Sequence, residues 1–382
     1  MRIAVIGSVS KPTRYETPGG VEVWTSLFLL ESIKRGHVFD LYSLRDSLQI
    51  PNKINLITVS NKGVDEIKNS KSFGEKHQRE YDSASLLGIF FSRITLLIKE
   101  NEQSYDIVIN SSGSPLLTVN WDFYKKPLLT IAHFAAFEPF VSYFEYFPLP
   151  NNIFYAFPSL RESELAKEIP GKQKFHIPHG VDVEKITFRE NGARNILWFG
   201  RLDPTMPKGL IEAIHISNKM EIPIDIYTHV EDISYFKRTV KPLLTKYTNF
   251  QINTPRNDFF NKAKLFLLPL GWEEPFGLTI LESMVSGTPV VAYAKGAVPE
   301  IVRDGETGFI VNSSDDDLRG DWIIKKTGIE GLCEAVKKIY KMPDSQYAAM
   351  RKACRKNAET NFTTGKMVDS YETAYRKILS GH

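Results

Sequence analysis

Short apolar runs alternate with amphipathic stretches along the whole chain. The runs are continuously apolar, a pattern typical of strands buried on both faces in parallel sheets covered by helices. The pattern predicts a first series of strands at residues 2–6, 38–42, 107–109, 128–131, 154–157 and 174–177, and a second at 195–199, 224–227, 265–268, 289–292 and 308–311. Helices are expected between them, for example at residues 21–34, 210–219, 278–286 and 329–341.

This repetition of strand and helix predicts an α/β protein with two doubly wound parallel sheets. The polar segment 184–194 separates the two series, and it contains the turn formers Asn191 and Gly192. We therefore expect an N-terminal Rossmann-like domain over residues 1–186 and a C-terminal one over residues 187–364. A last helix, at about residues 365–382, follows a series of strands that is already complete.

Composition narrows the class of protein. The 382 residues include 48 Lys+Arg and 45 Asp+Glu, which gives a net charge of +3. This small charge argues against a protein that binds nucleic acid through its overall positive charge. The two cysteines, Cys333 and Cys354, are most simply buried thiols in a reducing compartment. Neither a secretory leader nor a membrane span is expected, so the predicted location is cytoplasmic. The apolar stretch 86–98 favours a core helix, with contact at the inner face of a membrane as an alternative.

Ligands of open α/β sheets bind outside the carboxyl ends of the strands. No GxGxxG follows the first strand and no Walker A pattern occurs, which counts against a dehydrogenase and a P-loop enzyme. Gly19 and Gly20 precede a helix, where they either let the backbone approach a ligand or simply form a loop. Arg201 and Lys208 follow the strand 195–199 and suit a diphosphate; the alternative is two solvated surface cations.

The most informative stretch is residues 272–282, Trp-Glu-Glu-Pro-Phe-Gly-Leu-Thr-Ile-Leu-Glu. A helix beginning near Leu278 places Glu274 just before it and Glu282 about one turn inside it. The backbone amides of residues 277–279 would then form an anion site between two carboxylates.

In this order and spacing, the motifs resemble those of the retaining glycosyltransferases of family 4, also called group 1. The resemblance covers nearly the whole chain and rests on the Glu-x7-Glu (EX7E) pair of Glu274 and Glu282 and on the segments 19–21, 179–182, 200–209, 287–291 and 307–309. It implies the GT-B fold, with two Rossmann-like domains facing a central cleft and the last helix packing back on the first domain. It also implies transfer of a sugar from a nucleotide-sugar donor to an acceptor hydroxyl with retention of the anomeric configuration, in the biosynthesis of a polysaccharide, another glycan or a glycoconjugate.

The resemblance also implies a role for each candidate residue. In the second domain, Glu274 would be catalytic and bind hydroxyls of the donor sugar, and Glu282 would bind the ribose. The remaining donor-binding positions of that domain would be Arg201, Lys208, Phe276, Gly277, Leu278 and Thr279.

In the first domain, His133 would be catalytic and face the transferred sugar, and Gly19 and Gly20 would approach the diphosphate from across the cleft. A satisfied core histidine is the alternative for His133. The aromatic segment 134–157 is partly core and has the acceptor side of the cleft as an alternative role.

Two further patterns have simple structural interpretations. The run Asp315-Asp316-Asp317 contains a DxD, the metal signature of another transferase fold, but it follows a strand and favours a surface turn. A series of cations near the C-terminus predicts a solvated helix face: Lys337, Lys338, Lys341, Arg351, Lys352, Arg355 and Lys356.

We expect no metal and no resident cofactor, because Arg201, Lys208 and the helix terminus can balance the charge of the diphosphate. A UDP-sugar is favoured over a GDP- or ADP-sugar, although Tyr227 and Asn253 stand where the family places glycine near the base. The acceptor would be a saccharide, a lipid-linked molecule or a small molecule, and the oligomeric state is open. The alternatives are a GT-B protein that binds a sugar nucleotide without turnover, and a related phosphorylase or epimerase.

Overall fold

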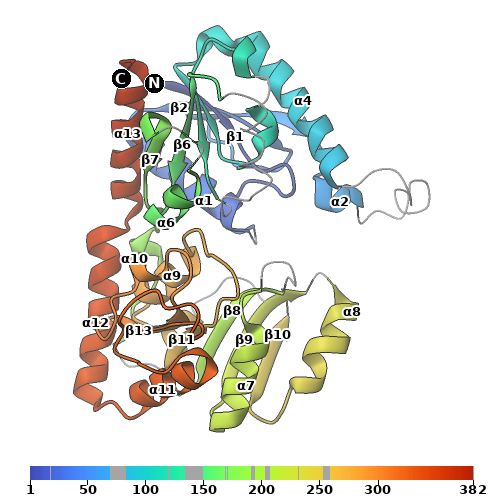
Figure 1. Ribbon diagram of the computed structural model, residues 1–382. Coiled ribbons are helices and arrows are strands. Elements are labelled where there is room, and N and C mark those ends of the chain that lie inside the picture. The colour runs from blue at the N-terminus through green and yellow to red at the C-terminus, as the bar shows by residue number, and fades with distance from the viewer. Residues whose placement is uncertain are drawn as a thin grey trace. The chain divides into compact units, whose positions relative to one another are not determined.

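The computed structural model describes residues 1–17, 19–68, 83–118, 121–133, 149–167, 169, 171–190, 194–202, 207–230, 232–252 and 259–381. The chain divides into two compact units (Figure 1). Unit 1 comprises Met1–Gly180 with Thr364–His382, and unit 2 comprises Val181–Thr363. Most of the aromatic segment (134–148), the link between Arg201 and Lys208 (203–206) and Asn253 lie outside the described residues.

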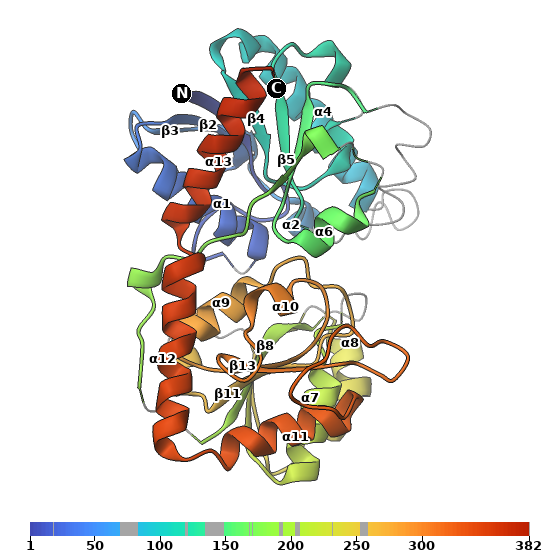
Figure 2. The same cartoon turned by 60° about the vertical axis from the view of Figure 1, so that its left-hand side comes forward.

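Unit 1 is built on a seven-stranded parallel sheet with the order β3-β2-β1-β4-β5-β6-β7. Its strands are β1 (Arg2–Ile6), β2 (Val38–Leu44), β3 (Ile54–Ser60), β4 (Ile107–Asn110), β5 (Leu128–Ile131), β6 (Ile153–Phe157) and β7 (Lys174–His176). Helices cover the sheet: α1 (Gly20–Lys34), α2 (Val64–Lys68), α4 (Ser83–Asn101), α6 (Leu160–Leu165) and α13 (Thr364–Leu379). The C-terminal helix α13 packs along α1, as both views show (Figures 1 and 2).

Unit 2 is built on a six-stranded parallel sheet with the order β10-β9-β8-β11-β12-β13. Its strands are β8 (Ile196–Leu202), β9 (Ile224–Val230), β10 (Thr248–Ile252), β11 (Leu265–Leu268), β12 (Val290–Tyr293) and β13 (Gly308–Val311). Its helices are α7 (Leu210–Met220), α8 (Ile233–Tyr235), α9 (Leu278–Val285), α10 (Val298–Ile301), α11 (Gly328–Tyr340) and α12 (Asp344–Asn361). Trp198 of β8 packs into the core with α7 and α11, whereas its neighbour Leu197 packs into the core with α9 and α12, so both faces of the sheet are buried.

The predicted pair of parallel α/β sheets is confirmed, and every strand that the apolar runs predict is present. Strand β8 runs on to Leu202, so Arg201 lies within the strand and not after it. Cys354 is buried, as expected, but Cys333 is only half-buried. Among the described helices, none combines the length and the apolar character needed to cross a bilayer.

The expectation that Arg351 lies on a solvated face is wrong. Arg351 is fully buried (0% exposed) on α12, and its guanidinium donates to backbone carbonyls of Arg189, Ala263 and Asn261 at 2.9, 3.1 and 3.2 Å. A buried cation is tolerated when its donors are all given acceptors, and carbonyl oxygens at the ends of loops provide them here. The neighbouring Lys352 does lie on the surface, where it pairs with Glu190.

Candidate functional site

The strand order of unit 2 reverses between β8 and β11, which run side by side. In a doubly wound sheet, the connections leaving two such strands diverge to opposite faces and leave a crevice at the carboxyl ends. Strand β8 ends in Gly200-Arg201-Leu202, and β11 is followed by Pro269-Leu270-Gly271-Trp272. The residues predicted to bind an anion therefore lie at the carboxyl end of β8 or in the segments that follow β8 and β11.

Lys208 is fixed at this edge by contacts of the backbone around it. The amide of Gly271 donates to the carbonyl of Pro207 at 2.9 Å, and the indole of Trp198 donates to the carbonyl of Lys208 at 3.0 Å. Gly209 has φ +73°, and a Cβ there would stand 1.8 Å from the carbonyl oxygen of Pro269. Only glycine permits this approach, which holds the start of α7 against the end of β11.

Lys208 and Glu274 form an ion pair, with 3.1 Å between Nζ and Oε2. The Glu274 residue is only 7% exposed, whereas the Lys208 side chain is 22% exposed, so the ammonium remains partly open to solvent. The ring of Trp272 lies 5.8 Å from Nζ, within the range of a cation–π contact. An ammonium has three donors, so Lys208 can hold Glu274 and an anionic ligand at once.

Helix α9 begins immediately after this pair. The amides of Leu278 and Thr279 in its first turn have no acceptor within the helix and carry partial positive charge. Phe276 is buried against Phe362, with the ring centroids 6.0 Å apart, which anchors the turn before the helix. Glu282 lies in the second turn of α9 and is 5% exposed. The structure thus places the start of α9 between the two carboxylates, as the sequence predicts.

Arg201 is the remaining predicted cation of unit 2. It is exposed near the end of β8, opposite His229 of β9 in the sheet register. With Lys208 and the first turn of α9, it makes this edge of the sheet favourable for an anion.

A charged network not foreseen from the sequence lies beside Glu274. Arg319 binds both carboxylate oxygens of Glu273, at 2.6 and 2.8 Å, and its Nε donates to Asp317 at 2.7 Å. Asp317 also pairs with Lys295. Hydrogen bonding to Glu273 raises the pKa of Arg319, and hydrogen bonding from Arg319 lowers the pKa of Asp317. Asp315 and Asp316 form a turn after β13, as expected, whereas Asp317 belongs to this network.

In unit 1, His133 follows β5 and lies in a cluster of rings. Its centroid is 4.8 Å from that of Trp24 on α1 and 5.3 Å from that of His179. Burial lowers the pKa of His133 to about 3 and the pKa of His179 well below its usual value, so both rings are neutral at pH 7. Within the described part of the chain, Nε2 of His133 is buried without a hydrogen-bond partner.

Gly19 and Gly20 stand at the start of the same helix, α1. Gly19 is partly buried and Gly20 is exposed. A Cβ on Gly19 would meet the Glu22 carboxylate at 2.0 Å, because that side chain folds back over the glycine. Glu22 itself is buried, and this burial raises its pKa.

Residues 185–360 match the family model of the glycosyl transferases group 1. This part of the chain is a group 1 glycosyl transferase domain. Its motif pair Glu274 and Glu282, together with Arg201 and Lys208, lies within the matched residues.

The chain matches its curated relatives over less than half of their own length. An uncharacterized protein in the cps region of Klebsiella pneumoniae is 27% identical over 48% of this chain and 46% of its own. The D-inositol 3-phosphate glycosyltransferase of Mycobacterium avium is 36% identical over 32% of this chain and 26% of its own.

Solved structures show the fold over the whole chain. Sucrose-phosphate synthase from Thermosynechococcus elongatus superposes with a TM-score of 0.76 at 15% identity and covers 100% of both chains. Anabaena HepE in complex with UDP-glucose superposes with a TM-score of 0.68 at 14% identity over 98% of this chain and 99% of its own. The two parallel-sheet units have the architecture of the GT-B glycosyltransferases.

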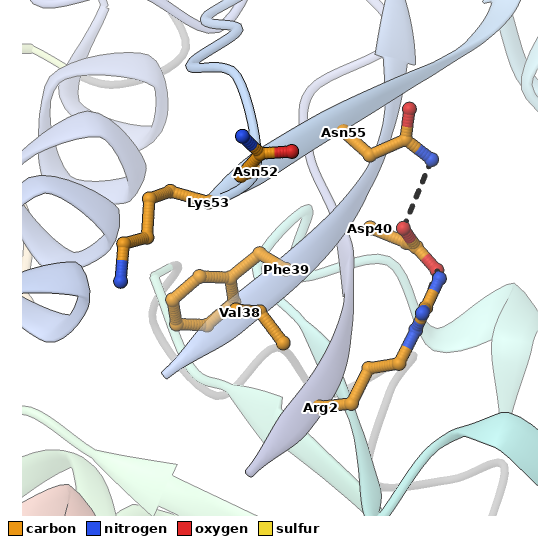
Figure 3. Close-up of a pocket in the computed structure, with 7 residues that line it drawn as sticks. All are labelled: Arg2, Val38, Phe39, Asp40, Asn52, Lys53 and Asn55. Carbon is orange, nitrogen blue, oxygen red and sulfur yellow. Dashed lines mark hydrogen bonds and ion pairs between the residues drawn. The ribbon is translucent and has the colours of Figure 1, made fainter. Parts of the chain in front are cut away.

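A separate cavity in unit 1 lies at the opposite ends of the strands. It is lined at the amino ends of β1, β2 and β3 by Arg2, Val38, Phe39, Asp40, Asn52, Lys53 and Asn55 (Figure 3). Asp40 pairs with Arg2 at 2.8 Å and accepts from Asn55 at 3.0 Å, so its carboxylate is already engaged by its neighbours. Because ligands of such sheets bind at the carboxyl ends, this cavity is not the candidate site.

Sequence reasoning missed Trp272, Glu273, Lys295, Arg319 and, in unit 1, Glu22. The partners in the network are distant in sequence: Arg319 is 46 residues from Glu273, and Lys295 is 22 residues from Asp317. No local pattern indicates such pairs. Trp272 and Glu273 could have been found from their position directly before the motif.

Proposed function

We propose that the protein transfers a sugar from a nucleotide-sugar donor to an acceptor hydroxyl with retention of the anomeric configuration. The observation that carries this proposal is the Lys208–Glu274 pair at the head of α9, at the switch point of a sheet that belongs to the group 1 family. The Lys208 ammonium and the amides at the start of α9 can bind the anionic diphosphate of such a donor. The buried Glu274 carboxylate can accept hydrogen bonds from the hydroxyls of the neutral sugar.

The diphosphate would bind Arg201, Lys208 and the amides at the start of α9. As the bond from the sugar C1 to the diphosphate oxygen breaks, negative charge grows on the diphosphate and positive charge on the sugar ring. The two cations and the helix amides are fixed before the reaction, so they stabilise the leaving group without reorganising. This proposal requires no metal ion for charge balance.

Glu274 would accept hydrogen bonds from hydroxyls of the transferred sugar, and Glu282 from the ribose. Fixing the sugar aligns C1 with the acceptor oxygen, which attacks from the face that the diphosphate leaves. The new C1–O bond replaces the broken one, and the acceptor proton passes to the departing diphosphate oxygen. Glu274 acts on the reacting ring and Glu282 on a remote group, so we expect their kinetic contributions to differ.

In unit 1, His133 would offer Nε2 to the transferred sugar as a neutral imidazole, and Gly19 and Gly20 would approach the diphosphate. The absence of a partner for Nε2 among the described residues supports this role, because a buried polar atom without a partner is costly.

We propose a UDP-sugar as the donor and a saccharide, a lipid-linked molecule or a small molecule as the acceptor. The choice of UDP is supported by HepE, which shares the fold and was solved with UDP-glucose.

A screen of UDP-, GDP- and ADP-sugars tests the proposal, with thermal stability and release of nucleoside diphosphate as readouts. We expect at least one UDP-sugar to raise the melting temperature and to be turned over when acceptor is present. Stabilisation without turnover would indicate a silent binding protein. Turnover that requires inorganic phosphate would indicate a phosphorylase, and conversion of the donor to its epimer without transfer would indicate an epimerase.

A further inference from the structure

We propose that Arg319 is a positioning residue for Glu274, acting through Glu273. This inference rests on the proposed function, because it concerns the carboxylate that would hold the donor sugar. It is drawn from the geometry of a loop that contributes nothing to the sequence motif.

Arg319 and Gly296 together hold the Glu273 carboxylate in place. The carboxylate accepts from both terminal nitrogens of Arg319, at 2.6 and 2.8 Å, and from the backbone amide of Gly296 at 2.6 Å. A bidentate guanidinium–carboxylate pair fixes direction as well as distance. Glu273 therefore ties three segments together: the motif, the turn after β12 and the loop after β13.

Hydrogen bonds of both its side chain and its backbone hold Arg319 in place. Its Nε is held by Asp317, and its backbone amide donates to Oδ1 of Asn312 at 2.9 Å. Asn312 in turn donates to the carbonyl of Gly320 at 3.0 Å. Asp317 accepts from Ser313 at 2.6 Å as well as pairing with Lys295. The loop that carries Arg319 is thus fastened to the end of β13 before it reaches Glu273.

The turn after β12, which Glu273 binds, also contacts the backbone of Glu274. The amide of Ala297 donates to the carbonyl of Glu274 at 2.9 Å. Gly296, with φ +54°, lies so close that a Cβ would stand 2.0 Å from that carbonyl oxygen. The turn bound by the Glu273 side chain therefore also bears on the Glu274 backbone. Releasing Glu273 would free the peptide from which the Glu274 side chain projects.

The charges around Arg319 favour a role in positioning Glu273 over a role in binding a ligand. Two cations, Arg319 and Lys295, face two carboxylates, Glu273 and Asp317, so the network is neutral. Each of these side chains is 19–28% exposed, so solvent screens part of the attraction between the charges. The bidentate geometry of the Arg319–Glu273 pair therefore contributes more to fixing Glu273 than the charge alone. A neutral network does not compete with Arg201 and Lys208 for a diphosphate.

The test compares R319M, R319K, E273M and the double variant R319M/E273M with the wild type at saturating donor, each normalised to the fraction of protein that binds UDP. R303M is the matched control, because Arg303 pairs with Glu306 on the surface of the same unit at 3.2 Å. We expect R319M and E273M each to lower kcat about tenfold with the UDP Kd changed less than about threefold. The kcat of R319K should lie between those of R319M and the wild type, since lysine keeps the charge but cannot form the bidentate pair with Glu273.

The double variant should lose about as much activity as either single variant, roughly tenfold and not a hundredfold, because both remove the same contact. A purely structural role would lower the melting temperature but leave kcat per UDP-binding site unchanged, and that result would overturn the inference. Equal losses in R319M and R303M, or additive losses in the double variant, would also overturn it. If the wild type turns over no nucleotide sugar, the proposed function fails as well; wild-type turnover with an unaffected R319M overturns only the role of Arg319.

Discussion

At the scale of single residues, burial sets the protonation of the two histidines in the ring cluster beside α1. The pKa of His133 falls to about 3 in the folded chain, and that of His179 also falls, because burial penalises the charged ring. An unfolded histidine titrates near its ordinary pKa of about 6.5. Between these values the unfolded chain binds more protons than the folded one, so the free energy of unfolding decreases as pH falls through this window.

We therefore predict that H133Q loses less stability than the wild type when pH is lowered from 7 to 5. Urea unfolding at both pH values measures the change. H215Q, at an exposed histidine of α7, should follow the wild type. Parallel losses in H133Q and the wild type would contradict a His133 ring that is neutral in the folded chain.

Which site residues the sequence could predict depends on how local their signals are. Arg201 lies in the last residues of a strand, and Lys208, Glu274 and Glu282 lie close to helix starts. Their placement therefore follows from secondary structure alone. Arg319 contacts Glu273 through a loop whose path depends on tertiary packing, and the same is true of the Arg351 guanidinium among backbone carbonyls. A cation in a helical pattern indicates a solvated face unless its acceptors, which lie far away in sequence, are known.

At the scale of elements, Arg351 joins α12 to the segments that precede β8 and β11 in unit 2. R351M keeps most of the aliphatic volume but leaves the carbonyls of Arg189, Ala263 and Asn261 without their donors. We predict that it lowers the free energy of unfolding of unit 2 by about 3 kcal/mol, the cost of stranding buried acceptors. Chemical denaturation followed by circular dichroism measures the loss, and K352M on the exposed face of α12 is the control. A loss no larger than that of K352M would show that Arg351 does not fasten the helix.

Helix α13 belongs to unit 1 through its aromatic face. Tyr371 is fully buried, with ring centroids 5.3 Å from Phe28 and 5.7 Å from Trp24 of α1. We predict that Y371A destabilises unit 1 by about 3 kcal/mol or more, because the lost ring leaves a cavity.

Y371F is the matched control for Y371A. Among the described residues the Tyr371 hydroxyl has no hydrogen-bond partner, so its removal should leave stability unchanged or raise it. Thermal unfolding of both variants separates packing from hydrogen bonding. A Y371F variant as unstable as Y371A would contradict this packing account.

Two of the described strands were not predicted from the sequence, and both lie at an edge of their sheet. β3 and β10 each have a strand neighbour on one side only, and most of their residues are partly or fully exposed. Continuous apolar runs identify strands that are buried on both faces, so half-covered strands such as Thr248–Ile252 lack this signal.

At the scale of the whole molecule, the alternation of strands and helices was enough to predict two parallel-sheet units. The chemical identity of the donor and acceptor is not encoded in such periodicity, because it depends on a few side chains around a common framework. Asn253 and residues 134–148, which the sequence associates with the base and the acceptor, lie outside the described residues.

The proposed reaction should proceed without a divalent metal ion. Among the described residues, no three His, Cys, Asp or Glu side chains gather closely enough to hold one, and the proposed function assigns the charge of the diphosphate to Arg201, Lys208 and the start of α9. We predict that the rate in EDTA stays within about twofold of the untreated rate, since fixed protein charges stabilise the leaving group. Loss of transfer in EDTA that magnesium or manganese restores would contradict this prediction.

In the proposed reaction, Glu274 holds the reacting sugar while Glu282 holds a remote part of the donor. The most direct test is steady-state kinetics of E274A and E282A with the donor found in the screen, with E306A as a surface carboxylate control. Orientation of the reacting ring matters most at the transition state, so E274A should lower kcat about a hundredfold or more. E282A should mainly raise the donor KM, by roughly tenfold, because its contact is equal in ground and transition states. A near-normal kcat in E274A, with the donor verified, would contradict the account of the site.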